Sequence, residues 1–554
     1  MRPRKVQPRA VPVRRSRVPR EERLRRAGPF LYYSCAALLV ARVVLRSWIE
    51  EDAFITFRVV DNLVHGYGLR WNVFERVQSY TNPLWMLLHI PVYAVTGSIV
   101  HTTLALCWGC LLAVLFAVRK TFDFSLVRHA TLFVVPLLVS ATHSLFFSSG
   151  LETPLLNLLF VCFGYVLLRR PRRYWFWLSL LTSLSAWTRL DTVLVYVPFW
   201  VWALLSQLRT PTPGTSRRPL QSTLLEIISG TVPLLCWLLF SLFYYGFLLP
   251  NTAPAKLAAG LPQRDYVRSG LAYTLDFLLA DPWSAALIFA ASVYFPVVAW
   301  RSRGRGAAED ACAAALAVGA FLYVVYAAWI GGYQLSLRMS TLPALAACWL
   351  WLWRFPFRSD RACLVAGALA LNVNMILGMS PDARYRVPFI QQQKISGKPM
   401  ARFLFVRRGP SWTSVGLDQE TLKARPAAWG EPKYVVQRAI GMYGFYNGPS
   451  CRIVDPCGLS DPLLARLPSR NEHLQRVGHI ERDIPSGYLQ AVATGSPASM
   501  VSPLSEYYSK LQLITQGSLW DPRRLGSILR FNLGQYDSLR KQYLRQAQRS
   551  PSPE

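Results

Sequence analysis

The chain has 554 residues, of which 52% are hydrophobic, 13% aromatic and only 16% charged, and its formal net charge is +31. A soluble globular protein usually carries about a quarter charged residues, so this composition excludes an ordinary soluble domain and favours a membrane protein. In a soluble chain such a positive charge would indicate nucleic acid. Here the basic residues lie in short blocks between apolar runs, so we expect no nucleic-acid partner.

The basic blocks predict which ends of the apolar runs face the cytoplasm, because short cytoplasmic loops are rich in Lys and Arg. Residues 1–27 form the first block and are predicted to be a cytoplasmic tail, since no small-residue cleavage site follows them. With the other blocks on the same side, residues 28–380 cross the membrane about eleven times. The predicted spans lie near 28–48, 97–118, 129–147, 153–168, 174–188, 190–206, 223–247, 283–300, 310–330, 341–353 and 362–380. Two shorter apolar segments, near 83–96 and 268–281, are predicted to be interfacial or re-entrant helices.

This threading, which uses only the basic blocks, places the polar motifs together on the outer face. They are the first outer loop 49–82, "SSGLET" at 148–153, "TRLD" at 188–191, "YYGFLLPNTAPAK" at 244–256 and "GGYQLSLR" at 331–338. The separation of polar motifs from basic blocks predicts a functional site at the outer ends of the helices.

Residues 381–545 have ordinary globular composition and are long enough for one domain with its own core. Strand-like pieces such as "KYVVQRAIG" and "CRIVD" mix with helical stretches, so we expect an α/β domain, and residues 546–554 should be a disordered tail. Cys451 and Cys457 lie in this polar region and could form a disulfide if it is outside the cytoplasm. The sequence contains no Cys or His spacing that is typical of a metal site. It does not exclude a divalent cation as cofactor.

Glu51 and Asp52 directly follow the first apolar run. They could simply cap or solvate a helix end. The following Phe54, Ile55 and Phe57 form an amphipathic pattern that favours a helix lying against the membrane. A carboxylate held at that boundary could act as general base on a hydroxyl group.

Several cations occur on the predicted outer face, where the charge bias of membrane proteins disfavours them. Any one of them could contact lipid headgroups, whereas several that converge would bind a phosphate. Glu152 and Asp191 could orient such cations, and "PNT", with Asn251, favours a turn whose side chains bind hydroxyl or backbone groups. The cations are Arg58, Arg76, Arg189, Lys256 and Arg338.

Taken together and in order, these segments resemble GT-C glycosyltransferases of the mycobacterial terminal arabinofuranosyltransferase type. The resemblance rests on "EDAFITFR", "NLVHGYGLRWNVFERVQSYTNPLW", "GLET", "TRLD", "YYGFLLPNTAPAK", "GGYQLSLR", "AIGMYGFYNGPSCRIVDPCGLSDPLLAR" and "GHIERDIPSGYL". It implies a polytopic α-helical membrane protein of the GT-C type with a C-terminal α/β periplasmic domain. It further implies a bacterial inner-membrane enzyme with a cytoplasmic N-terminus, surrounded by membrane lipid.

The activity implied by the resemblance is transfer of a sugar, such as D-arabinofuranose, from a decaprenylphosphoryl-type donor to a glycan or glycoconjugate acceptor. On that pattern Asp52 is the acid/base residue and Glu51 the second carboxylate. The donor phosphate would contact Arg58, Arg189, Lys256 and Arg338. Candidates for sugar or acceptor contacts are Glu152, Asp191, Asn251, Tyr333 and His479.

Two departures from the family pattern affect the acceptor. Tyr333 stands where the family has an acidic residue, and Glu51 stands where it has Asp. Tyr333 could indicate a different acceptor or a stacking contact with a sugar. Asp455, Asp461 and His479 could bind the acceptor or stabilise the C-terminal domain. The alternatives are a transporter or flippase of a lipid-linked sugar, and a non-catalytic glycan-binding scaffold with this fold.

Overall fold

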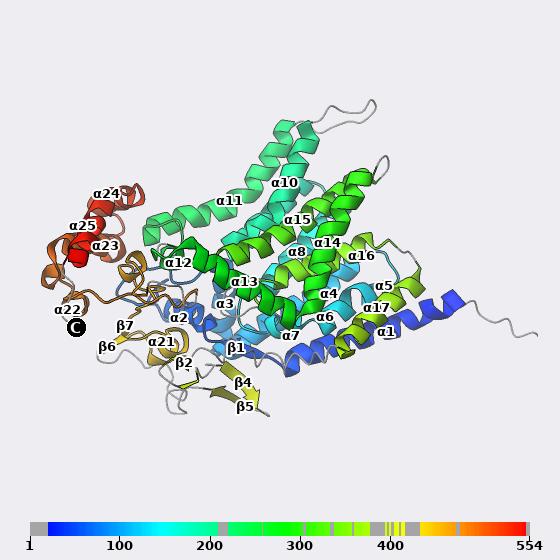
Figure 1. Ribbon diagram of the computed structural model, residues 1–554, viewed down its shortest axis with the longest axis horizontal. Helices are drawn as coiled ribbons and strands as arrows, with labels where there is room; N and C mark the ends of the chain where they lie inside the picture. Colours follow the sequence, from blue (N-terminus) through cyan, green and yellow to red (C-terminus); the bar gives the residue numbers. More distant parts are fainter. Residues whose placement is uncertain are drawn as a thin grey trace, which may run out of the picture.

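The computed structural model describes residues 20–208, 220–257, 259–302, 306–332, 337–356, 359–376, 394–395, 398–399, 404–408, 411–415, 433–471 and 477–549. Residues before 377 form a bundle of helices, and the region after 433 covers the end of that bundle opposite the start of α1 (Figure 1). The helices of the bundle are α1 (Arg20–Leu45), α2 (Ala53–Val64), α3 (Pro83–Thr96), α4 (Ile99–Thr121), α5 (Leu126–His129), α6 (Val135–Val139), α7 (Ala141–Phe146), α8 (Thr153–Arg169), α9 (Tyr174–Thr188), α10 (Val193–Leu208), α11 (Leu220–Tyr245), α12 (Thr252–Leu257), α13 (Gln263–Ala280), α14 (Pro282–Arg301), α15 (Ala307–Trp329), α16 (Thr341–Arg354) and α17 (Asp360–Ile376).

Five helices among the described residues are long and apolar enough to cross a membrane. They are Arg26–Leu45 within α1, then α4, α11, α14 and α15. Shorter apolar helices, among them α3 and α8, lie between them. The expectation of a polytopic helical membrane protein is therefore confirmed, whereas the number of eleven crossings stays a prediction.

The predicted span 129–147 is interrupted. A π-helical turn at Ala130–Val134 joins α5 to α6, and the helix then breaks at Ser140 before α7. The break is stabilised by Asp281, whose carboxylate accepts hydrogen bonds from the Ser140 hydroxyl and the Thr142 amide. A polar side chain from a distant segment thus ends a helix that its apolar sequence would continue.

The helix α2 does not lie on the membrane, contrary to the amphipathic pattern in its sequence. Residues 53–62 are all buried, because α3 and α21 (Gly441–Asn447) pack against it. The Phe54 ring contacts the Phe445 ring of α21 at a centroid distance of 5.5 Å. The side of α2 that carries Phe54 is covered by a segment almost 400 residues away, which no local pattern reveals.

Short strands connect the bundle to the region that follows it. β1 (Trp48–Glu50) pairs antiparallel with β4 (Leu404–Arg408), which pairs in turn with β5 (Ser411–Val415). β2 (Lys394–Ile395) and β3 (Lys398–Pro399) form a separate antiparallel pair. β6 (Lys433–Val436) and β7 (Cys451–Val454) form a parallel pair connected through α21, so the predicted strands in "KYVVQRAIG" and "CRIVD" are confirmed.

The C-terminal helices pack around a core of their own, whereas α21 and most of β7 join the core of the bundle. The predicted domain boundary near residue 381 lies outside the described residues. The described part of 381–545 contains the short strands and several longer helices. These C-terminal helices are α22 (Tyr488–Thr494), α23 (Ser502–Gln516), α24 (Pro522–Asn532) and α25 (Asp537–Arg549).

A glycine controls the close approach of α21 to the start of α2. A Cβ atom at Gly441 would lie 2.1 Å from the Glu51 carbonyl oxygen, so Gly441→Ala must separate the two segments. We expect the substitution to cost about 1–3 kcal/mol, as overpacked cores do, and to lower the apparent Tm. Gly526→Ala is the matched control, since Gly526 also lies in a helix but a Cβ there meets nothing within 4 Å. Equal melting temperatures for the two variants would contradict the close packing.

Candidate functional site

A cavity of about 300 Å³ lies between the bundle and the C-terminal region. It is lined by the start of α2, by the turn between α9 and α10, and by α12 and the segment before α16. Their charged side chains in its wall are Asp52, Arg189, Asp191, Lys256 and Arg338. Four segments that the sequence separates by up to nearly 300 residues thus contribute two acids and three cations of the predicted site to one space.

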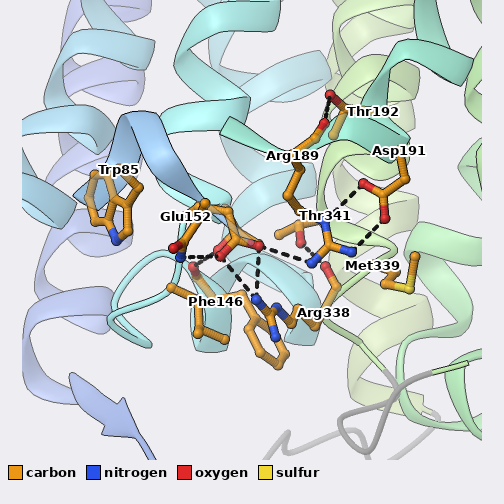
Figure 2. Close-up of polar contacts among 12 residues, drawn as sticks. Trp85, Phe146, Glu152, Arg189, Asp191, Thr192, Arg338, Met339 and Thr341 are labelled. Carbon is orange, nitrogen blue, oxygen red and sulfur yellow. Dashed lines mark hydrogen bonds and ion pairs between the residues drawn. The ribbon is translucent and has the colours of Figure 1, made fainter. Parts of the chain in front are cut away.

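The cations are held by a buried carboxylate. Glu152 is fully buried, and both of its carboxylate oxygens accept hydrogen bonds from Nη2 of Arg338, at 2.9 and 3.0 Å. Oε1 also accepts from Nη1 of Arg189 at 3.3 Å, and Arg189 forms a two-pronged ion pair with Asp191 through Nε and Nη2 (Figure 2). Two guanidinium groups are therefore fixed side by side in the wall of the cavity.

Local backbone geometry places these groups at helix ends. Arg189 has an extended backbone, with φ −156° and ψ 118°, which ends α9 and starts the 3-10 turn Leu190–Thr192. Glu152 immediately precedes α8, whose second residue is Pro154. Because the residues that flank a helix can direct their side chains away from its packed face, charged groups fit here without interrupting an apolar helix.

A relay of hydrogen bonds connects this network to α2. The Thr56 hydroxyl donates to Oδ1 of Asn82 at 2.9 Å, and Nδ2 of Asn82 donates to Oε2 of Glu152 at 3.1 Å. Thr56 lies one helical turn after Asp52, so the relay fixes the start of α2 relative to the two arginines. Neither Thr56 nor Asn82 was predicted as a site residue, although the Asn-Pro pair at 82–83 is a turn signal.

The surroundings shift the pKa values of Glu152 and Lys256 by different causes. Burial alone would raise the pKa of Glu152, but the guanidinium groups of Arg338 and Arg189 outweigh it and lower the pKa to about 2. Burial lowers the pKa of Lys256 to about 8, while the Asp52 carboxylate acts in the opposite direction. Glu152 is thus ionised at any physiological pH, whereas Lys256 loses its charge in mildly alkaline solution.

Glu51 has a different place from Asp52. It does not line the cavity; its Oε1 accepts hydrogen bonds from the backbone amides of Gly441 at 2.6 Å and Met442 at 3.3 Å. Burial and then the charge of Asp52 raise the pKa of Glu51 to about 8. The predicted second carboxylate therefore joins α2 to α21, whereas Asp52 lines the cavity together with Asp191.

The wall of the cavity on the side of α9 and α11 is aromatic and apolar. It contains Trp187 of α9 and Trp237 of α11, whose ring centroids are 5.8 Å apart, and Tyr80 lies beside Trp237. Leucines that are exposed on the molecular surface continue this wall outward. They are Leu190, Leu248, Leu249 and Leu257.

Some polar groups in the cavity wall have no hydrogen-bond partner among the described residues. They include the hydroxyl of Ser79 and the indole N–H of Trp187. An unpaired buried donor costs free energy unless a ligand or water satisfies it. Neither residue was predicted, because a serine in a loop and a tryptophan in an apolar run carry no sequence signal of a site.

Arg58 and Asn251 are two further predicted site residues that lie outside this cavity. Arg58 is buried in α2, donates to the carbonyl oxygens of Cys451 and Gly448, and stacks on Trp71 at 4.2 Å. The side-chain amide of Asn251 donates to the carbonyl oxygens of Gly458 and Asp461. Both side chains bind the C-terminal region to the bundle, and their predicted contacts with donor and sugar stay predictions.

The remaining candidates also lie outside the cavity wall or outside the described residues. Arg76 donates to the Gly517 carbonyl oxygen, and Tyr333 lies outside the described residues. His479 is partly exposed and is not part of the cavity wall, although Val477 is. Asp455 and Asp461 accept hydrogen bonds from backbone amides of their own turns, with Asp461 also accepting from the Tyr488 hydroxyl. These bonds give the two aspartates a structural role.

The predicted disulfide is absent, since Cys451 and Cys457 are both free and buried. Cys451 belongs to β7 and to the core of the bundle, whereas Cys457 lies in the next turn, where its amide donates to Asp455. Within the described part of the chain, no group of three His, Cys, Asp or Glu side chains could hold a metal ion.

Comparison with known proteins finds a similar enzyme and a similar solved structure. No protein-family model matches the sequence. The chain is 27% identical over 274 residues to the terminal beta-(1->2)-arabinofuranosyltransferase of Mycobacterium tuberculosis. The resemblance predicted from the motifs is confirmed. The aligned part is 46% of this chain and only 39% of that relative. The crystal structure of ArnT from Cupriavidus metallidurans bound to undecaprenyl phosphate aligns over 66% of each chain with 14% identity and a TM-score of 0.39.

The buried ion pairs make a prediction about stability. Glu152→Gln removes the charge that compensates Arg338 and Arg189, and breaking a buried pair costs about 3–5 kcal/mol. We expect a clearly lower apparent Tm. Glu309→Gln is the control, because Glu309 also pairs with an arginine, Arg354, but is exposed, so its loss should change Tm little. If the two variants melt alike, Glu152 does not hold the cavity together.

Proposed function

We propose that this protein is a membrane glycosyltransferase that moves a sugar from a polyprenyl-phosphate donor to a hydroxyl group of an acceptor. The single observation that supports it best is the composition of the cavity. Asp52 and three cations, Arg189, Lys256 and Arg338, line the same space as an apolar wall that continues to exposed leucines. An anionic group attached to a long hydrocarbon chain fits both parts of such a cavity.

The donor phosphate would bind at the cationic end. Arg189 and Arg338 are oriented by Glu152, and a rigid guanidinium group binds phosphate oxygens with little loss of conformational entropy. Lys256 adds a point charge from α12. The isoprenoid chain would run along Trp187 and the leucines beyond it, toward the hydrocarbon of the membrane.

The transfer step needs a base and a stabilised leaving group. The acceptor oxygen attacks the anomeric carbon of the sugar while Asp52 takes the hydroxyl proton. The bond from that carbon to the phosphate oxygen breaks, and the electron pair leaves with the polyprenyl phosphate. Fixed cations that face the departing oxygen stabilise the charge that develops there.

The identity of the sugar rests on the resemblance. The motifs and the 27% identity to an arabinofuranosyltransferase favour a D-arabinofuranosyl group on a decaprenyl-phosphate carrier, with a cell-envelope glycan as acceptor. Ser79 and the indole N–H of Trp187 are available for sugar hydroxyls, and the aromatic rings beside them can cover a sugar face. With the basic blocks in the cytoplasm, the reaction takes place on the outer side of the inner membrane.

The role of Asp52 is tested by Asp52→Asn, which keeps the shape of the side chain and removes its basicity. We expect transfer from synthetic decaprenylphosphoryl arabinofuranose to fall about 10²- to 10⁴-fold, measured as release of decaprenyl phosphate by the purified protein. Asp123→Asn is the control, because Asp123 is exposed and pairs with Arg169, the last residue of α8. Normal turnover by the Asp52 variant, with an unchanged Tm, would remove the proposed mechanism.

Lys256 makes the proposed donor affinity dependent on pH. Since its pKa is about 8, the ammonium form that binds an anion is present below that pH and is lost as the pH rises through it. The KM for the donor should therefore increase between pH 7 and pH 9. Lys256→Arg stays charged throughout this range, so its KM should be nearly constant. Parallel KM profiles for the two proteins would mean that Lys256 does not contact the donor phosphate.

A further inference from the structure

The helix α24 exposes one apolar flank and one basic flank. Its inner side, formed by Arg524, Ser527 and Ile528, is buried. Leu525, Leu529 and Leu533 follow one another at intervals of four residues and are 39%, 63% and 64% exposed. Because residues four apart lie on the same side of a helix, these leucines form a continuous apolar flank. The exposed residues Arg523 and Arg530 lie on the opposite flank.

This helix is fixed to the end of α11, one of the helices long enough to span a membrane. Nη2 of Arg524 donates to the carbonyl oxygens of Phe243 and Tyr244 at 2.8 and 2.9 Å, and both residues lie in the last turn of α11. The side-chain amide of Asn532 donates to the carbonyl oxygen of Gly246 at 2.8 Å. In Figure 1, α24 lies beside the end of α11 that faces the C-terminal region.

An exposed tryptophan connects the two helices. Trp520, just before α24, is 76% exposed, and its ring centroid lies 4.9 Å from that of Phe243. Exposed leucines such as Leu235 and Leu239 continue along α11, where a membrane helix contacts lipid. Exposed apolar side chains thus lie both along the span and beside its end, where Trp520 contacts Phe243.

We propose that α24, together with Trp520, is an interfacial helix that holds the C-terminal region on the membrane surface. Leu525, Leu529 and Leu533 insert among the upper acyl chains, and Arg523 and Arg530 contact phosphate headgroups. A membrane surface is favoured over a protein partner for two reasons. The leucines continue the lipid-facing surface of α11, and a tryptophan with arginines beside an apolar flank suits the polar–apolar boundary of a bilayer.

Such an anchor has a structural consequence for the cavity. The backbone amide of Arg76 donates to the carbonyl oxygen of Thr515 at 2.8 Å, and its side chain reaches the Gly517 carbonyl oxygen between α23 and α24. Residues 78–82 of the same loop line the cavity. An α24 fixed to the membrane therefore sets the height of that loop relative to the lipid.

The experiment measures the environment of α24 in the full-length protein in lipid nanodiscs. A nitroxide is attached at Leu529→Cys, in a Cys236→Ser background that removes the exposed native thiol. We expect relaxation by oxygen, which concentrates in acyl chains, to be strong and relaxation by a water-soluble nickel chelate to be weak. The matched control is Gln490→Cys on α22, which is exposed in the same region and should show the reverse pattern.

Two results would overturn the proposal. A label at 529 that is as accessible to the nickel chelate as the label at 490 would place α24 in water. A label at 529 shielded from both reagents would mean that protein, such as a second copy of this chain, covers the leucine flank. Neither readout depends on glycosyl transfer, so the result stands apart from the proposed enzymatic function.

Discussion

The burial of Glu152 between two guanidinium groups is the interaction on which the cavity depends. A fully buried carboxylate is very costly unless cations and hydrogen bonds compensate it. Arg338, Arg189 and Asn82 supply that compensation from three separate segments of the chain. The bundle can therefore hide the carboxylate only when those segments meet, so the electrostatic requirement of one side chain also brings the groups of the site together.

The same pairing explains how cations can face a substrate beside a membrane. Asp191 and Glu152 balance the charges of Arg189 and Arg338, so the two guanidinium groups are fixed before any ligand binds. Lys256 is the cation whose pKa responds to Asp52. If Asp52 takes up a proton during transfer, Lys256 loses a nearby negative charge at the moment when the phosphate becomes the leaving group. Proton uptake and stabilisation of the leaving group would thus be coupled through the charge of Asp52.

The sequence singled out those candidate residues that are recognisable by their position relative to the membrane. Arg189, Lys256 and Arg338 stand out because basic residues are rare at the outer ends of spans, and the threading alone puts them on the same face of the membrane as Asp52. It failed where the partner is distant. Nothing near Arg58 predicts that carbonyl oxygens from residues 448 and 451 will bind it, or that α21 will cover α2. The unpaired groups of Ser79 and Trp187 likewise become visible only once the cavity exists.

Most of the contacts that the sequence did not predict join the C-terminal region to the loops around the cavity. Glu51 binds the first amides of α21, and Asn251 binds the turn that carries Asp461. These side chains resemble site residues in the sequence because they are polar groups at the ends of apolar helices. Their hydrogen bonds are nevertheless used within the protein, where they fix the loops from which Asp52 and Lys256 reach the cavity. A shift of the C-terminal region would therefore move both residues, although it contributes few side chains to the cavity wall.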